Sequence, residues 1–183
     1  SVRPRDSRAP GGGLRIAYAG SLGVTYDLAT AIEAVKLDGS LRLAIAGKGE
    51  RERRLVEFAA SLGVEDRVEF SGYLDESALA DFLGSCDMAI VPMRGDSCIG
   101  VPYKLADYAR AGLPVASSLG GECDRLLARY DAGRSYRYAD AGSLLAAVSS
   151  IASGLPRMRR NARRMAEEEF DAEAIYADMR RFV

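Results

Sequence analysis

The residues best suited by type and spacing to bind a ligand lie between Pro102 and Pro114. Val101 and Pro102 precede a helical pattern, and proline is favoured near a helix start because the first turn has no use for its missing N–H group. Lys104 follows in the first turn, where the helix dipole opposes a cation. A lysine in this place, beside free backbone N–H groups, indicates an anionic ligand such as a diphosphate.

Asp107 comes three residues after Lys104 and therefore lies on the same face of the helix. A carboxylate accepts hydrogen bonds from two hydroxyl groups, such as those of a ribose. The two residues together favour a nucleotide-like ligand. An ion pair between them at the protein surface explains the same spacing equally well, and the residues alone leave both interpretations open.

Strands and helices alternate along the chain, and their order decides where these residues lie. Short apolar segments predict six strands, over residues 14–19, 41–46, 67–72, 87–92, 114–118 and 134–138. Helical spacing covers 27–37, 50–62, 75–83, 101–111 and 121–130, with two or three more helices after residue 140. This alternation predicts one doubly wound α/β domain with a parallel sheet and right-handed crossovers.

In an open parallel sheet, ligands bind beyond the carboxyl ends of the strands. The loops that follow the predicted strands are rich in glycine, which lets a backbone approach a ligand closely. They contain Gly20, Ser21 and Gly23 after the first strand, Gly47-Lys48-Gly49 after the second, and Gly72-Tyr73 after the third. Loops of this fold also carry glycine for packing reasons, so each loop alone is a weak signal.

Length and composition narrow the classes of protein. The chain has 183 residues, of which 48% are hydrophobic, so a globular domain is expected over residues 14–183. Residues 1–13 are polar and rich in glycine and proline, which predicts a linker or lead-in segment and no signal peptide. The net charge of -1 argues against nucleic acid as a partner.

The chain offers few groups for metal binding or redox chemistry. It has no histidine, and its three cysteines are scattered. We therefore expect no zinc site and no disulfide framework, and a reducing cytoplasm is the default location. No Asp-x-Asp pair occurs either, so a metal-bridged diphosphate is not indicated.

Residues 14–182 resemble the C-terminal domain of GT-B-fold glycosyltransferases, glycosyltransferase family 4 in particular. The resemblance rests on the order and spacing of five segments, residues 19–22 with 31–34, 43–50, 66–73, 86–92 and 104–115. It implies a Rossmann-like parallel sheet of about six strands that corresponds to the C-terminal half of a GT-B fold. It also implies a nucleotide-diphosphate sugar as donor substrate, with no separate cofactor.

The resemblance assigns roles to particular residues. In this family the diphosphate meets the loop after the first strand, here Gly20 to Gly23, and the start of the helix that carries Asp107. The acidic residue on that helix, here Asp107, binds the ribose. The base lies near the loop after the third strand, here Gly72 and Tyr73.

Two family positions after the first strand are changed in this sequence. An arginine and a lysine that clamp the diphosphate are replaced by Ser21 and Tyr26. The Pro-x-Lys start of the later helix resembles a branch of these transferases in which that lysine supplies the missing cation. We therefore predict that Lys104, with the helix start at Val101, is the main diphosphate contact and the catalytic residue, and Lys48 is the poorer candidate.

The family also carries two glutamates eight positions apart, the first of which touches the donor sugar. The second corresponds to Asp107, and the first to Ile99, which cannot do that work. Asp96 is an alternative only if the loop runs differently.

The resemblance implies an enzyme of two such domains, of which this chain supplies one. We expect the donor-binding half of a retaining glycosyltransferase, inactive without an N-terminal acceptor domain and acting on a glycan or lipid-linked acceptor. A non-catalytic binding or scaffolding module is the rival, and a nucleotide-sugar epimerase on the same fold is a weaker third.

The arginine run 157–164, followed by Glu167 to Glu169, favours a solvated helix with i,i+4 ion pairs, with contact at the inner face of a membrane as the alternative.

Overall fold

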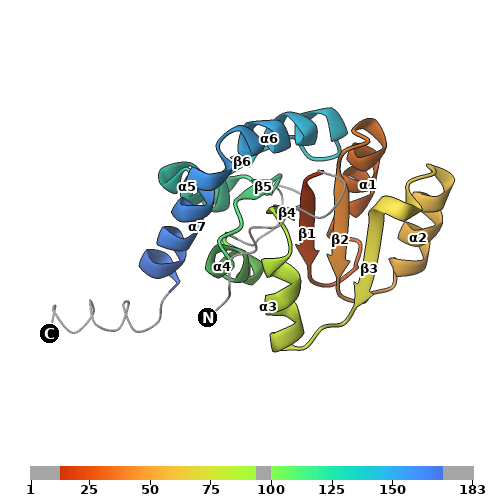
Figure 1. Cartoon of the computed structure of the whole chain (residues 1–183), viewed down its shortest axis with the longest axis horizontal. Helices are drawn as coiled ribbons and strands as arrows, with labels where there is room; N and C mark the ends of the chain where they lie inside the picture. The colour runs from red at the N-terminus through yellow and green to blue at the C-terminus, as the bar shows by residue number, and fades with distance from the viewer. Residues whose placement is uncertain (1–12, 94–99, 171–183) are drawn as a thin grey trace, which may run out of the picture.

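A sheet of six parallel strands forms the centre of the molecule (Figure 1). The computed structural model describes residues 13–93 and 100–170. Along the sheet the strands follow the order β3-β2-β1-β4-β5-β6, so the order reverses between β1 and β4. Their bounds are β1 (Arg15–Ala19), β2 (Arg42–Ala46), β3 (Val68–Gly72), β4 (Met88–Val91), β5 (Val115–Ser117) and β6 (Gly133–Ser135). This topology confirms the predicted doubly wound α/β fold.

Helices cover both faces of the sheet. They are α1 (Leu28–Leu37), α2 (Glu52–Ser61), α3 (Glu76–Gly84), α4 (Tyr103–Arg110), α5 (Gly121–Tyr130), α6 (Ala141–Ser153) and α7 (Leu155–Glu169), with a 3-10 turn η1 (Glu65–Arg67). Each strand alternates its side chains between the faces, so Ile16 and Tyr18 of β1 pack under α1, α2 and α6. Ala17 points to the other face, where a second buried cluster lies under α3, α4, α5 and α7.

The last strand is shorter than its sequence pattern predicts. Residues 134–138 were expected to be extended, but β6 runs only from Gly133 to Ser135. Its neighbour β5 has three residues, and Val115 and Ser117 already pair with the two ends of β6. Beyond Tyr136 the chain turns away through Ala139, which has a left-handed backbone (φ 55°). The predicted lead-in segment, apart from Gly13, lies outside the described residues.

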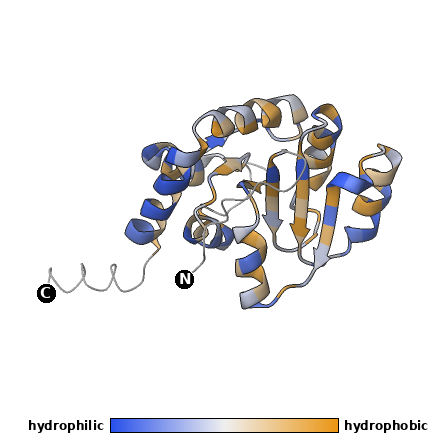
Figure 2. Cartoon of the chain, viewed as in Figure 1, coloured by the Kyte–Doolittle hydropathy of each residue, from blue (hydrophilic) through white to orange (hydrophobic). Residues whose placement is uncertain are grey.

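The C-terminal helices pack against the domain. α7 buries Met158, Ala162 and Met165, and Figure 2 shows hydrophilic residues on its outward side. Arg164 pairs with Glu168 at 3.8 Å, an i,i+4 contact of the predicted kind. Within residues 13–93 and 100–170, no helix is long and apolar enough to cross a membrane.

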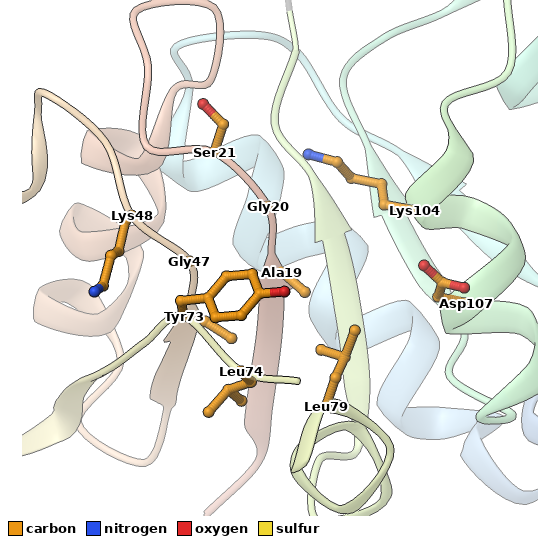
Figure 3. Close-up of a pocket in the computed structure, with 11 residues that line it drawn as sticks. Ala19, Gly20, Ser21, Gly47, Lys48, Tyr73, Leu74, Leu79, Lys104 and Asp107 are labelled. Atoms are coloured by element: carbon orange, nitrogen blue, oxygen red, sulfur yellow. The ribbon is translucent and has the colours of Figure 1, made fainter. Parts of the chain in front are cut away.

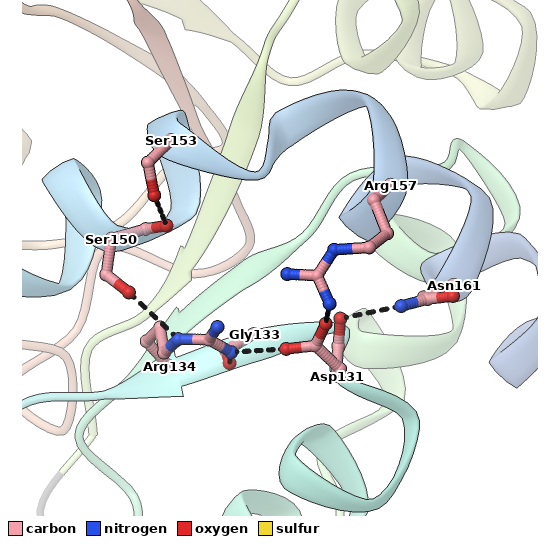
Figure 4. Close-up of polar contacts among 7 residues, drawn as sticks. All are labelled: Asp131, Gly133, Arg134, Ser150, Ser153, Arg157 and Asn161. Atoms are coloured by element: carbon pink, nitrogen blue, oxygen red, sulfur yellow. Dashed lines mark hydrogen bonds and ion pairs between the residues drawn. The ribbon is translucent and has the colours of Figure 1, made fainter.

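Asp131 ties these helices to the edge of the sheet (Figure 4). It ends α5 in the left-handed conformation (φ 48°), and its carboxylate pairs with Arg134 at 2.8 Å and with Arg157 of α7. Its carbonyl oxygen accepts a hydrogen bond from Asn161 at 3.2 Å. Arg134 also donates to Ser150 of α6 at 3.0 Å. One residue therefore links α5, β6 and α7 directly, and α6 through Arg134.

We expect Asp131→Ala to lower the free energy of unfolding by about 2 kcal/mol, because it removes two ion pairs and leaves a Cβ in a left-handed residue. Asp131→Gly relieves the backbone strain and should cost about half as much. Urea denaturation of both variants measures the difference. Equal stability of Asp131→Ala and the parent would contradict the linking role.

Candidate functional site

A pocket of about 480 Å³ opens where the strand order reverses, beyond the carboxyl ends of β1 and β2 (Figure 3). This is the place where open parallel sheets bind ligands. Three loops, α3 and α4 contribute to its wall. The lining residues are Ala19, Gly20, Ser21, Ala46, Gly47, Lys48, Tyr73, Leu74, Leu79, Lys104 and Asp107.

Backbone atoms of two glycine loops form one side of the pocket. Gly20 N–H donates to the Ala46 carbonyl at 2.9 Å, and Gly47 N–H donates to the Gly72 carbonyl at 2.7 Å. A Cβ on Gly47 would lie 1.8 Å from the Gly20 carbonyl oxygen, and the φ of Gly47 is +137°. Glycine is therefore required at Gly47 for the loops after β1 and β2 to meet.

These contacts decide which backbone donors the loop after β1 can offer a ligand. Gly20 N–H and Leu22 N–H already donate to carbonyls of the neighbouring strand end and loop. Ser21 N–H and Gly23 N–H have no acceptor within the described part of the chain. Ser21 and Gly23 can therefore offer their N–H groups to an anion.

Lys104 extends from the first turn of α4 toward the loop after β1 (Figure 3). Its Nζ donates to the Tyr18 hydroxyl at 3.2 Å, and that hydroxyl donates to the Ser21 carbonyl at 2.7 Å. The ammonium also lies 3.7 Å from the ring centroid of Tyr26 and 4.4 Å from that of Tyr18. A Cβ on Gly20 would come within 2.9 Å of Nζ, so glycine leaves room for the lysine.

The alternative ion pair between Lys104 and Asp107 is wrong. Asp107 pairs instead with Arg110, one turn further along α4, at 3.6 Å. Burial raises the pKa of Asp107 above its ordinary value, Arg110 lowers it and Glu76 raises it further. The two side chains thus reach different parts of one pocket: Lys104 extends toward the glycine loop, and Asp107 lies further along α4, across the pocket from Tyr73 (Figure 3).

The hydroxyl of Tyr108 fixes α4 against the sheet. Ala19 N–H donates to this hydroxyl at 2.9 Å, and the hydroxyl lies 3.3 Å from the Ala19 carbonyl oxygen. Tyr108 is completely buried. It therefore sets the distance between the helix that carries Lys104 and the strand end that carries the loop.

The remaining pocket wall is apolar on the side of β3. Tyr73 is 76% exposed, and Leu74 and Leu79 pack partly against the buried cluster beneath α3 and α4. An exposed ring beside two leucines suits a flat, partly apolar ligand group.

Not every predicted site residue lines this pocket. Gly20, Ser21, Tyr73, Lys104 and Asp107 do. Gly23, Gly72 and Val101 lie outside its lining, although Gly72 supports it through its bond to Gly47, and Val101 packs on the buried cluster. Asp96 and Ile99 lie outside the described residues.

Helix α4 begins two residues later than its sequence pattern predicts. Pro102 is extended (φ -74°, ψ 141°), and its carbonyl accepts the first helical hydrogen bond, from Leu105 N–H at 2.9 Å. Lys104 is therefore the second helical residue, which keeps it in the first turn as expected.

Sequence reasoning missed several lining residues. Ala19, Ala46, Leu74 and Leu79 carry no polar group, and only their positions beside the strand ends could have indicated them. It also missed the role of Tyr18 and Tyr26 around Lys104, because this contact joins residues far apart in the chain.

Burial lowers the pKa of Lys104 to about 7, whereas an unfolded lysine titrates near about 10.4. Between these pH values the unfolded chain binds more protons than the folded chain, so this residue makes stability rise with pH across that window. Below it both states carry the proton and the contribution is constant.

We predict that the unfolding free energy of the parent rises more between about pH 7 and about pH 9 than that of Lys104→Met, which lacks this titration. Urea denaturation at fixed ionic strength measures both slopes, and Lys36→Met at an exposed position is the control. Identical slopes for the parent and Lys104→Met would contradict the buried state of Lys104.

A model of the family described as "Glycosyl transferases group 1" matches residues 14–153. No curated protein matches the chain in sequence. HepE of Anabaena, in complex with UDP, is similar in structure with a TM-score of 0.80 at 15% identity, over 93% of this chain and 48% of HepE. Sucrose-phosphate synthase of Thermosynechococcus elongatus also has a TM-score of 0.80, at 20% identity over 95% of this chain and 45% of its own.

The pneumococcal O-GlcNAc transferase GtfA, in complex with UDP and GlcNAc, has a TM-score of 0.75 at 17% identity. The match covers 97% of this chain and 36% of GtfA. The chain thus spans about half the length of HepE and of the synthase, and less of GtfA. These likenesses support the same fold.

Proposed function

Because the chain belongs to the group 1 family of glycosyl transferases, we propose that it is the donor-binding half of a retaining glycosyltransferase. The enzyme transfers a sugar from a nucleotide-diphosphate sugar to a glycan or lipid-linked acceptor. The observation that carries the proposal is one pocket that brings together the Lys104 ammonium, the Asp107 carboxylate and the Tyr73 ring. An N-terminal acceptor domain is its partner, since the chain spans only about half the length of HepE.

The diphosphate occupies the space between the start of α4 and the loop after β1. Lys104 reaches this space from the helix, and Ser21 lines it with an N–H group that has no protein acceptor among the described residues. The positive end of the helix dipole adds to the attraction. Lys104 thus compensates for Ser21 and Tyr26, which stand where the family has two cations.

The ribose and base extend from there toward β3. Asp107 accepts hydrogen bonds from the ribose hydroxyls, and its side chain is 51% exposed, so its carboxylate is accessible to them. The base lies on Tyr73, beside Leu74 and Leu79. The UDP bound by the similar HepE makes uridine diphosphate the first probe to test.

The catalytic contribution is electrostatic. The bond between the anomeric carbon and the diphosphate oxygen breaks, and its electron pair stays on that oxygen. Negative charge therefore grows beside Lys104, where a buried cation stabilises it more than one in water. Lys104 is the catalytic residue in this sense.

A scaffolding module on the same fold is the second candidate. Ser21 and Tyr26 stand at the family's two cationic positions. Loss of these diphosphate-binding cations is what a module without transferase activity would show, so it favours the scaffold. Titration with uridine and guanosine diphosphates and their sugars separates the two, since a scaffold binds none of them. A cytoplasmic location and peripheral contact with the membrane's inner face stay predictions.

We predict that Lys104→Ala weakens binding of UDP-glucose, or of whichever nucleotide sugar the parent prefers, by about ten- to a hundredfold. A charge-assisted hydrogen bond is worth about that much. Lys48→Ala should change the affinity by about threefold or less, because Lys48 lies across the pocket from the start of α4 (Figure 3). Calorimetric titration measures both. Equal affinity of Lys104→Ala and the parent would overturn the assignment.

The chain by itself should bind the donor without transferring sugar to an acceptor. Joining it to an N-terminal acceptor domain from the same enzyme should restore turnover, measured as release of the nucleoside diphosphate. Turnover by the chain alone would contradict the need for an acceptor domain, and donor binding without turnover in the joined protein would contradict the proposed catalytic role.

A further inference from the structure

We propose that Tyr26 is a positioning residue for donor binding, whose ring holds the Lys104 ammonium over the loop after β1. This inference rests on the proposed function, in which that ammonium binds the diphosphate. Tyr26 does not line the pocket itself, so it acts through Lys104 rather than on the ligand.

The two rings form an open cage around the ammonium. Tyr26 and Tyr18 meet edge to face, with centroids 5.6 Å apart and an interplanar angle of 61°. Nζ of Lys104 lies over both rings, closer to Tyr26. A ring face attracts a cation without neutralising it, so the positive charge stays available to a diphosphate.

The charged groups around Lys104 support this arrangement. On α4, Asp107 pairs with Arg110. In the loop after β1, the Asp27 carboxylate accepts from Thr30 N–H at 3.2 Å and from the Thr30 hydroxyl at 2.6 Å.

The other titratable side chains that the described residues place near Lys104 are tyrosines or lie across the pocket. They are the hydroxyls of Tyr18, Tyr26 and Tyr108, and Lys48 on the loop after β2. Among the described residues, no carboxylate lies within 4.0 Å of the Lys104 ammonium. Within that part of the chain, the ammonium contacts the two tyrosine rings and the Tyr18 hydroxyl.

The backbone of Tyr26 is fixed to the strand that leads to α4. Tyr26 forms an antiparallel bridge with Met93, and Asp27 N–H donates to the Pro92 carbonyl at 2.8 Å. Its side chain packs against both buried clusters. The Tyr26 ring is thus held at the end of β4, between the two buried clusters.

An aromatic residue is the suitable partner for this lysine. A second cation at position 26 would repel the ammonium at this short range. An aliphatic side chain would lack the negative ring face that attracts a cation. A lysine side chain has four flexible bonds and a strong preference for water, so without a partner it would extend into solvent.

A double-mutant cycle on the full chain tests the proposal, with UDP-glucose affinity measured by calorimetry. Tyr26→Phe keeps the ring and should bind within about twofold of the parent, whereas Tyr26→Leu should bind about three- to thirtyfold more weakly. In the Lys104→Ala background, Tyr26→Leu should have no further effect. An equal loss in both backgrounds would reveal only structural damage and would overturn the proposal.

Lysine labelled with ¹³C at Cε provides a second readout, because the chain has only Lys36, Lys48 and Lys104. The ring current of Tyr26 should displace the Lys104 signal in the parent and in Tyr26→Phe, and the displacement should shrink in Tyr26→Leu. An undisplaced signal in the parent would contradict the cage.

The outcomes separate this inference from the proposed function. If Lys104→Ala binds like the parent, the proposed function fails. If Lys104→Ala binds weakly and Tyr26→Leu binds normally, only the positioning role fails.

Discussion

The contact between α4 and the end of β1 is the constraint on which the site depends. The Tyr108 hydroxyl bonds to both backbone groups of Ala19, so the helix cannot shift along the strand without losing two hydrogen bonds in a completely buried place. Because Lys104 lies one turn before Tyr108, its direction toward the glycine loop follows from that contact. Asp107 precedes Tyr108 directly, so the same anchor places its carboxylate in the pocket.

The partial burial of Lys104 has an energetic cost and a functional consequence. Burial disfavours its charged form, as its lowered pKa shows, and the Tyr18 and Tyr26 rings offset part of that cost. A poorly hydrated cation interacts more strongly with an anion than a hydrated one does. The same partial burial that lowers the pKa of the lysine thus suits the diphosphate contact that we propose for it.

The glycines of the loops around the pocket leave space for the side chain of Lys104. Gly20 and Gly47 bring two loops into backbone contact, and the space that a Cβ on Gly20 would fill is taken by the Lys104 ammonium. Residues that look like losses from the family pattern, Ser21 and Tyr26, lie around that ammonium. They are therefore consistent with a cation that has moved from the loop to the facing helix.

Local periodicity and glycine placement predicted the order of the elements, the positions of the strand-end loops and the helix that Lys104 and Asp107 share. Their exact ends were less accessible, since the length of β6 depends on how much of β5 lies beside it. Only the tertiary structure decided that Lys104 contacts Tyr18 and Tyr26 instead of Asp107. Those contacts join residues about 80 positions apart in the chain, and only the packing of α4 beside β1 brings them together.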